Sequence, residues 1–462
     1  MIGILLQNGY EATDRLELAD FIVINTCGFL EASRQESIDT INKAIQDRKP
    51  QAKVIATGCM VQSHKEVVES CCPGVHYLLG SGDVEGILKA VTQEERGELV
   101  SDNKSYLEVG EVPRTVSTPK QYAYLKIAEG CRKRCSYCII PDIKGPLKSK
   151  PVDKVLSEIK ALIKNGFQEI ILIAQDLGDW GRDMGFQGSQ GLLHLLTAIT
   201  EDTTIAQSPV RFRLLYVYPD EITPELIQCI KANSKKIIPY LDMPIQHANS
   251  DILKAMRRNT TKEEVIQCIT QLRKAIPDIT IRTSLIVGFP GETEEHFEEL
   301  CDFVNEMKLD NVGIFTYSKE EKSHSALLPN HIPEEVKEKR YRRLMSLQKK
   351  IATNLNKKRY LKKIIEVTVD GYHPETKLLM IGRHQGQCPD IDGIVLINDG
   401  RLVTGFGKRY LVEITDISEY DLVGRVIKEI VEMSETPSRE AAPSKKHDSH
   451  SHQQSNSRLR VV

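Results

Sequence analysis

The most regular feature of the chain is an alternation of short apolar runs and longer amphipathic stretches across its middle part. Six runs have the length and β-branched content of buried strands, and the stretches between them repeat apolar residues at helical spacing. This order predicts a parallel sheet curled into an open (βα)6 barrel, with functional groups at the carboxyl ends of the strands. The predicted strands are Tyr122–Ile127, Glu169–Ile173, Arg211–Val217, Ile237–Met243, Thr280–Val287 and Val312–Tyr317. The predicted helices are Val152–Lys164, Leu192–Thr200, Pro224–Lys231, Lys262–Lys274 and Glu294–Met307.

The first part of the chain alternates in the same way on a smaller scale. Apolar runs at Phe21–Asn25 and Val54–Thr57 predict strands, and helical patterns follow at Glu31–Gln46 and Lys65–Glu69. This order predicts a small α/β domain with a parallel sheet. The polar stretch Leu99–Thr118 is typical of a linker.

The pattern changes after a basic helical stretch, Pro333–Lys363. Short apolar runs separated by Gly and Asp predict a small β-barrel with strands at Ile364–Val369, Leu379–Gly382, Gly393–Ile397 and Tyr410–Ile417. The polar end of the chain predicts disorder. We therefore divide the α/β chain into an N-terminal α/β domain, a partial barrel, a small β-barrel and a disordered tail, at residues 1–116, 117–347, 348–426 and 427–462.

Composition narrows the class of protein. The 462 residues are 40% hydrophobic and 27% charged, with a formal net charge of −2, which is typical of soluble multidomain proteins. This net charge does not indicate a nucleic-acid or membrane partner. No apolar run approaches the ~18 residues that a membrane helix needs, and the first residues lack a secretory pattern. We expect a cytoplasmic protein with no membrane partner.

The strongest chemical signal is the segment GCRKRCSYC, which holds Cys131, Cys135 and Cys138 and follows the first predicted barrel strand. Three thiolates at this spacing can bind a 4Fe–4S cluster and leave one iron open for S-adenosylmethionine (SAM). A zinc site and a redox pair are the alternatives. Structural zinc needs a fourth ligand, and a redox pair does not need Cys131. The basic residues inside the loop should favour thiolates over thiols: Arg132, Lys133 and Arg134.

This loop, the βα repeats and the flanking domains resemble the radical SAM methylthiotransferases over nearly everything except the tail. The resemblance implies an N-terminal domain with an auxiliary cluster, a radical SAM core and a C-terminal TRAM β-barrel. Four segments are similar to the type that modifies ribosomal protein S-twelve (the RimO type): INTCGFLEASRQES, IAQDLGDWGRD, LLYVYPDEIT and CPDIDGIV. The enzymes that modify tRNA adenosine are similar only loosely at these places.

The resemblance also implies a second 4Fe–4S cluster. Cys27 and Cys59 each end a predicted strand just before a helix, where a helix N-terminus stabilises a thiolate. They match two of the family's three auxiliary-cluster ligands. The third belongs to a Gly-Cys-x-Lys-Asn turn ahead of a helix, and here the chain opens at what resembles that helix, Ile2–Asn8. We expect a start codon assigned too far downstream, and the alternative is a degraded site.

Further family positions fall at predicted strand ends. The resemblance implies that Gln175 and Asp176 contact SAM, although a helix cap or turn explains these residue types equally well. In IVGFPGE, Gly288 and Gly291 would let the backbone approach a nucleoside and Glu292 would accept a hydrogen bond. A plain turn is the other interpretation. In EEKSHSALL, which begins at Glu320, this chain departs from a usual Gly-Thr pair, which predicts an altered loop.

The implied reaction is methylthiolation of the β-carbon of an aspartate in ribosomal protein S-twelve, using two SAM and a sulfur source. The implied partners are that protein or the small ribosomal subunit, and a reduced flavodoxin- or ferredoxin-type electron donor. Twelve Lys or Arg against three Glu in Pro333–Lys363 fit rRNA contact, but a solvated helix face explains them as well. The alternatives are a tRNA adenosine methylthiotransferase and a non-enzymatic iron–sulfur RNA-binding protein.

Overall fold

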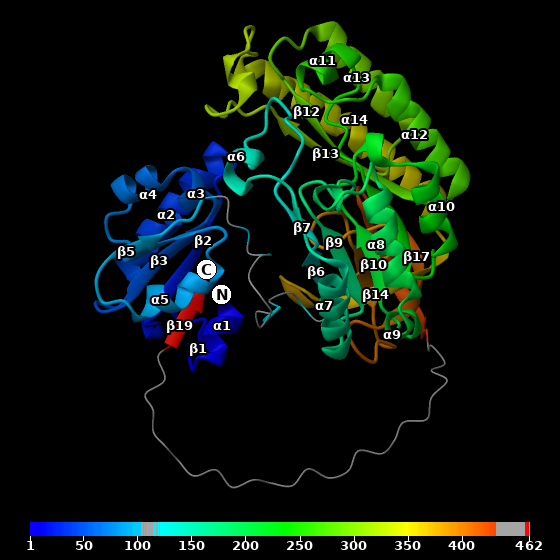
Figure 1. Ribbon diagram of the computed structural model, residues 1–462. Coiled ribbons are helices and arrows are strands. Elements are labelled where there is room, and N and C mark those ends of the chain that lie inside the picture. The colour runs from blue at the N-terminus through cyan, green and yellow to red at the C-terminus, as the bar shows by residue number, and fades with distance from the viewer. Residues whose placement is uncertain are drawn as a thin grey trace, which may run out of the picture.

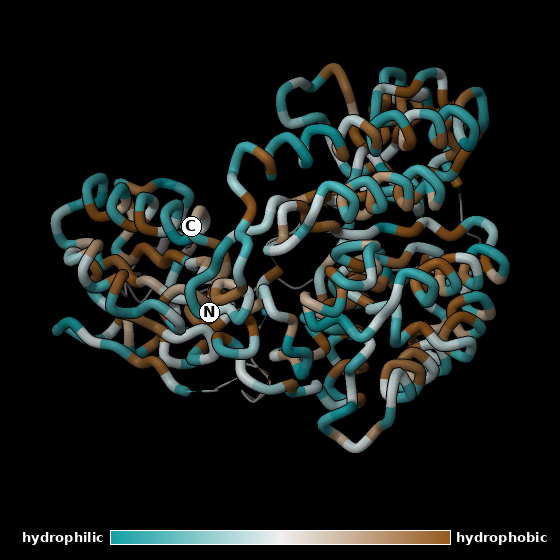
Figure 2. Tube along the Cα trace, turned by 90° about the horizontal axis from the view of Figure 1, so that it is seen from above, coloured by the Kyte–Doolittle hydropathy of each residue, from teal (hydrophilic) through white to brown (hydrophobic). Residues whose placement is uncertain are grey.

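The computed structural model describes residues 1–102, 105, 107, 114–116, 119, 121–430 and 458–461, and most of the predicted linker and tail lie outside these ranges. A smaller lobe holds the N-terminal residues and a larger one is built around the central sheet (Figure 1). Hydrophobic and hydrophilic segments alternate along the helices of both lobes, as helices with one buried face require (Figure 2). None of the described helices combines the length and the apolarity needed to cross a bilayer.

The smaller lobe contains a parallel sheet, as the sequence predicted. Its strands β2, β3, β4 and β5 lie side by side in chain order, and Thr26 pairs with Gly58 where β2 and β3 end. Helices α2 to α5 follow or separate these strands. The elements are α1 (Ile2–Gln7), β2 (Phe21–Thr26), α2 (Glu31–Asp47), β3 (Lys53–Gly58), α3 (Cys59–Ser63), α4 (Lys65–Cys71), β4 (Tyr77–Gly80), α5 (Ile87–Thr92) and β5 (Gly97–Leu99).

The predicted disorder of residues 427–462 is wrong at two places. β18 (Asp421–Glu429) extends beyond residue 426. β19 (Arg458–Val461) lies between β1 (Glu11–Ala12) and β2, parallel to both, so the two chain ends lie close together (Figure 1). A polar composition argues against a packed core, but a sheet edge offers unpaired backbone groups that any short strand can satisfy. The remaining tail residues, 431–457 and 462, lie outside the described residues.

The larger lobe contains six parallel strands in chain order, which confirms the predicted partial (βα)6 barrel. The third strand is shorter than predicted because Tyr216 has a φ of 64° and turns the chain. The strands are β6 (Tyr122–Lys126), β9 (Glu169–Ile173), β10 (Arg211–Leu214), β11 (Ile237–Asp242), β12 (Thr280–Val287) and β13 (Asn311–Thr316). The helices are α7 (Val152–Lys164), α8 (Gln190–Glu201), α9 (Thr203–Gln207), α10 (Pro224–Ala232), α11 (Ser250–Ala255), α12 (Lys262–Ala275) and α13 (Glu294–Met307).

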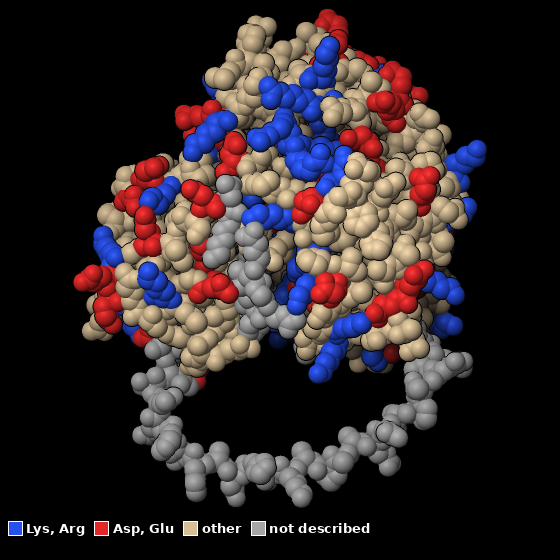
Figure 3. All heavy atoms as spheres, in the orientation of Figure 1, with Lys and Arg blue, Asp and Glu red and all other residues tan. Residues whose placement is uncertain are grey.

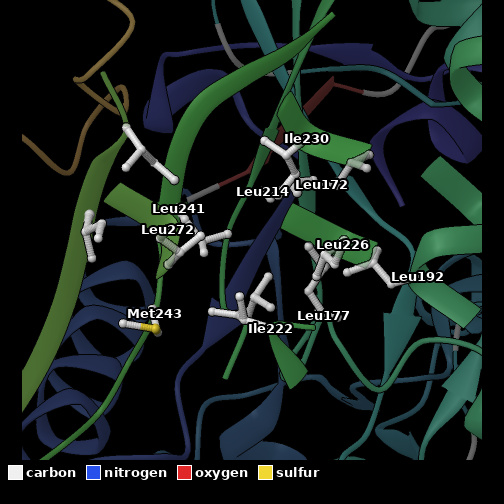
Figure 4. Packing of buried hydrophobic residues seen from close by; sticks show 14 of the residues in the cluster. Leu172, Leu177, Leu192, Leu214, Ile222, Leu226, Ile230, Leu241, Met243 and Leu272 are labelled. Carbon is white, nitrogen blue, oxygen red and sulfur yellow. The ribbon is translucent and has the colours of Figure 1, made fainter. Parts of the chain in front are cut away.

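The main core lies between these strands and the helices that cover them. Strand residues such as Leu172, Leu214 and Leu241 meet helix residues such as Leu226 and Leu272 in one apolar layer (Figure 4). Each fully buried side chain of this size contributes about 1.5–3 kcal/mol. The carboxyl ends of the strands, and the loops that follow them, lie beyond this layer.

A long helix, α14 (Glu334–Tyr360), leads into a closed barrel of five strands. The boundary that we placed between residues 347 and 348 falls inside this continuous helix. The sequence predicted four of the strands and missed β18, whose apolar residues form adjacent pairs on either side of Gly424. The strands are β14 (Ile364–His373), β15 (Thr376–Arg383), β16 (Val395–Asp399), β17 (Arg409–Ser418) and β18.

The C-terminal barrel contacts the amino-terminal ends of the central strands through buried ion pairs. Arg213 of β10 lies 2.7 Å from Glu169 of β9, and Arg383 of the C-terminal barrel lies 3.0 Å from the same carboxylate. The hydroxyl of Tyr240 donates to Asp392, also from the C-terminal barrel, at 2.7 Å. The C-terminal barrel therefore closes one end of the central barrel, and the opposite end holds the cysteine loop.

Candidate active site

The cysteine loop follows β6 and a two-residue strand, β7 (Ala128–Glu129). Gly130 begins the loop with a φ of 77°, and a Cβ there would clash with the carbonyl oxygen of Pro146. The Cys131 and Cys135 side chains are buried, at 9% and 8% exposure, and the Cys138 amide donates to the Cys135 carbonyl at 3.1 Å. All three cysteines therefore lie on one tight turn at the carboxyl end of the first barrel strand.

The three loop thiols do not form a compact single-ion site. Among the described residues, the only group of three ligand atoms within 4.8 Å of one another is acidic and contains no cysteine. Zinc bound tetrahedrally at about 2.3 Å holds its sulfur ligands about 3.8 Å apart. The 4Fe–4S cluster at the loop stays a prediction.

Burial controls the protonation of two of the loop thiols. It raises the pKa of Cys131 to about 12, with the nearby Asp176 carboxylate adding to the effect. Burial also raises the pKa of Cys138 to about 11. The basic loop residues therefore do not make thiolates of Cys131 and Cys138, contrary to our expectation, and a bound metal centre would have to replace the protons of these two thiols.

Lys133 lies inside the cysteine loop, but its ammonium pairs with carboxylates rather than with the loop thiols. Its Nζ lies 2.8 Å from carboxylate oxygens of Asp220 and Glu221 and 3.7 Å from Asp176. These carboxylates follow other barrel strands, so the ion pairs attach the loop to the neighbouring strand ends. The loop cation therefore anchors the backbone rather than the cluster.

The cation that does face a thiol comes from a segment that the sequence did not indicate. Arg258 follows α11, and its Nη1 lies 3.7 Å from the Cys135 Sγ. Its Nη2 donates to the Pro244 carbonyl at 2.6 Å, and its guanidinium stacks over the Tyr218 ring at 3.9 Å. Arg258 is buried and its guanidinium is fixed by these contacts, so its charge would offset the negative charge of a cluster bound at the loop. No spacing rule could find Arg258, because its proximity depends on folding.

Gln175 and Asp176 follow β9 directly, beside Cys131. Both Asp176 carboxylate oxygens are buried without a hydrogen-bond partner, and so is the Gln175 Oε1. Burial, followed by the neighbouring Glu221 carboxylate, raises the pKa of Asp176 well above its usual range. Buried polar atoms without partners are rare, so these positions have hydrogen-bonding capacity for a ligand held next to the loop.

The loop after β12 is braced by its own side chain. The Glu292 carboxylate accepts hydrogen bonds from the Gly288 amide at 2.6 Å and from Arg340 at 2.9 Å. Gly288 and Gly291 have φ values of 76° and 83°, and a Cβ on Gly288 would clash with the side chain of Lys337. The backbone conformation of the loop therefore explains why glycine occurs at both positions. The contact of this loop with a nucleoside stays a prediction.

Cys27 and Cys59 lie next to each other at the ends of β2 and β3. A Cβ on Gly28 would lie 2.6 Å from the Cys59 carbonyl oxygen, so the two loops touch. Cys59 begins α3, and α3 packs against α6 (Ile140–Lys144), which starts two residues after Cys138. The two cysteine sites thus face each other across the lobes. Among the described residues, no third cysteine, histidine or carboxylate joins this pair within 4.8 Å.

Basic side chains gather on the upper half of the face in Figure 3, over the loops of the larger lobe. In α14 the positive charge is partly neutralised. Arg340 pairs with Glu292, and Arg343 pairs with Glu298 at 2.6 Å. Lys337 donates to the Tyr317 carbonyl at 2.9 Å. The excess of Lys and Arg over Glu that the sequence shows in Pro333–Lys363 is therefore partly neutralised at the surface of this helix.

A cleft elsewhere in the molecule does not contain any of the predicted site residues. It lies between the central strands at their amino ends and the C-terminal barrel, and is lined by Gln121, Arg211, Arg383 and Lys408 among others. The chemistry-bearing loops instead lie at the opposite ends of the strands, in agreement with the rule for parallel barrels.

Three family models match consecutive parts of the chain. Residues 1–80 match the "Uncharacterized protein family UPF0004", residues 125–304 match the "Radical SAM superfamily" and residues 363–427 match the "TRAM domain". These ranges cover most of the smaller lobe, most of the central barrel and the C-terminal barrel, in that order.

Curated relatives match almost the whole chain. A "Ribosomal protein uS12 methylthiotransferase RimO" of Protochlamydia amoebophila is 60% identical over 92% of this chain and 89% of its own length. The proteins of the same name from Chlamydia abortus and Bdellovibrio bacteriovorus are 51% and 40% identical over 93% of this chain, covering 92% and 94% of their lengths.

A solved structure supports the fold alone. The radical S-adenosylmethionine methyltransferase TsrM from Kitasatospora setae, with cobalamin and a [4Fe-4S] cluster bound, superposes with a TM-score of 0.50 at 14% identity. The match covers 68% of this chain and 64% of that one. This likeness concerns the fold of the matched part of the chain.

Proposed function

We propose that this chain, which belongs to the RimO family of radical SAM methylthiotransferases, replaces a hydrogen on the β-carbon of an aspartate in ribosomal protein S-twelve by a methylthio group. The observation that carries this proposal is the buried three-cysteine turn at the end of β6, in a chain 60% identical to a protein named for that activity. The family implies a 4Fe–4S cluster and SAM as cofactors.

Cys131, Cys135 and Cys138 would hold the cluster. When bound, cluster and SAM supply a 5′-deoxyadenosyl radical. Gln175 and Asp176 would orient the amino group of SAM, because their unpaired buried oxygens accept hydrogen bonds beside the loop. Gly288 and Gly291 would let the loop after β12 approach the nucleoside, while Glu292 holds that loop in shape.

Cys27 and Cys59 would supply two ligands of an auxiliary 4Fe–4S cluster, from which the sulfur is transferred. Their contact through Gly28 and the packing of α3 on α6 support this role, because they bring the two cysteine sites to facing surfaces. A second SAM provides the methyl group and a sulfur source renews the donor.

The domain roles follow from this scheme. Residues 1–116 would carry the auxiliary cluster, 117–347 the SAM chemistry and 348–426 a TRAM module. Exposed Lys and Arg over the barrel loops (Figure 3) support contact with rRNA near the protein substrate. A reduced flavodoxin- or ferredoxin-type protein would deliver electrons, and a ribosomal substrate supports a cytoplasmic location.

The decisive experiment compares wild type with Cys131→Ala, Cys135→Ala and Cys138→Ala after anaerobic reconstitution. Cys229→Ala serves as a control, because it lies on α10 away from the loop. We expect the three loop variants to lose 5′-deoxyadenosine formation and the control to keep it. Mass spectrometry of S-twelve peptides and of tRNA then separates the substrates. Methylthioadenosine in tRNA with unmodified S-twelve would favour the tRNA alternative, and no SAM cleavage by wild type would favour a non-enzymatic RNA-binding protein.

A further inference from the structure

One segment hydrogen-bonds to both cysteine-bearing lobes. This segment, residues 317–325, follows β13 in the larger lobe and is here called the strap. On the larger lobe, the Ser325 amide donates to the Ser136 carbonyl at 2.7 Å, and the Tyr317 and Ser325 hydroxyls lie 2.8 Å apart. Ser136 lies directly between Cys135 and Cys138, so the strap is attached to the SAM-cluster loop itself.

The other contacts of the strap reach the smaller lobe. Glu320 Oε2 lies 2.7 Å from Arg34 Nη1, and Oε1 accepts from the Glu31 amide at 3.3 Å. Lys322 Nζ donates to the Ser63 carbonyl at 2.7 Å. Glu31 is the first residue of α2 and Ser63 the last of α3. The strap therefore holds both helices that follow the auxiliary-site strands.

The Glu320 contact extends to the auxiliary cysteine. Arg34 Nη1 also donates to the Gly28 carbonyl at 3.3 Å, and Gly28 is the neighbour of Cys27. The Glu320 side chain is only 3% exposed, so its charge is satisfied by Arg34 and the helix N-terminus rather than by water. A continuous series of polar contacts thus joins the Cys27 loop to the Cys135 loop through Glu320.

We propose that Glu320 is a positioning residue that sets the distance between the sulfur-donating site and the SAM-cleaving site. The inference rests on the proposed function. Since radical formation needs only the larger lobe, loss of Glu320 should uncouple SAM cleavage from methylthio transfer.

The test compares Glu320→Ala with Glu321→Ala, its exposed neighbour, in the full-length reconstituted enzyme. The main readout is the ratio of 5′-deoxyadenosine formed to methylthiolated S-twelve peptide. We expect this ratio to rise by about tenfold or more in the Glu320 variant, the factor associated with losing a charge-assisted hydrogen bond. The Glu321 variant should match wild type. An unchanged ratio in both variants would overturn the proposal.

Hydrogen exchange gives a readout that does not depend on activity. Without the Glu320 carboxylate, the first-turn amides of α2 should exchange about tenfold faster while those of α7 do not change. If Glu320→Ala does not fold, Arg34→Ala and Glu320→Gln take its place, and the glutamine variant should show a smaller effect because it can still accept from Glu31. Wild type that cleaves no SAM would contradict the proposed function, whereas unaltered α2 exchange would contradict only the strap.

Discussion

Arg258 should set the reduction potential of the SAM cluster. Its Nη1 contacts the Cys135 thiol, and the side chain is held there by the Pro244 carbonyl and the Tyr218 ring. Arg258→Met keeps the length and apolar stem of the side chain and removes the charge. The oxidised and reduced clusters differ by one electron, and a positive charge nearby favours the reduced form.

The magnitude follows from the 3.7 Å separation of Arg258 Nη1 and Cys135 Sγ. With the cluster charge spread over its atoms, about 5 Å is a reasonable mean distance, and an effective dielectric constant of about 20 gives about 3 kcal/mol. For one electron this corresponds to about 130 mV. We therefore expect the midpoint potential of the variant to be more negative by roughly that amount.

The assay is a redox titration of the reconstituted enzyme followed by electron paramagnetic resonance. Arg257→Met is the matched control, since Arg257 is adjacent but exposed, and Arg258→Lys should recover part of the shift because it restores a charge. A midpoint potential that is equal in wild type, Arg258→Met and Arg257→Met would refute the electrostatic role.

Three further predictions concern the same regions. Gly130→Ala should abolish cluster binding in an iron and sulfide assay, because its φ of 77° and the Pro146 carbonyl leave no room for a methyl group. Lys133→Met should lower the free energy of unfolding by about 3 kcal/mol in urea titrations, because it leaves Asp176 and Glu221 buried without a cation. Burial lowers the pKa of His384 to about 3, so its contribution to stability is complete above about pH 6.5 and is lost as the pH falls toward 3. The free energy of unfolding from urea titrations should therefore fall less between pH 7.5 and 5 in His384→Asn than in wild type, by about 2 kcal/mol. Parallel pH profiles of the two proteins would contradict this.

The alternation of apolar runs was sufficient to predict the central sheet. β9 and β12 and helices α7 and α13 have the predicted bounds, because a buried parallel strand and an amphipathic helix each require a local pattern of side chains. The prediction failed where local pattern was weak. β18 has adjacent apolar pairs on either side of Gly424 rather than a strict alternation, and β19 pairs through its backbone, so neither has a strong signal of its own.

The three cysteines of the barrel loop could be singled out as candidate ligands from the sequence for the same reason of locality. Cys131, Cys135 and Cys138 lie on one turn, and their spacing alone determines that they can share a cluster. Cys27 and Cys59 are 32 residues apart, and only the parallel pairing of β2 with β3 places them together.

The groups around these ligands were decided by tertiary structure. Arg258 reaches Cys135, Glu221 reaches Lys133 and Glu320 reaches Arg34 from segments far away along the chain. Burial then affects these groups, because it raises the pKa of Cys131 despite three basic neighbours and leaves the Asp176 carboxylate oxygens without a hydrogen bond. Sequence spacing specifies which atoms can bind a cluster, while charge and solvent access depend on distances that exist only after folding.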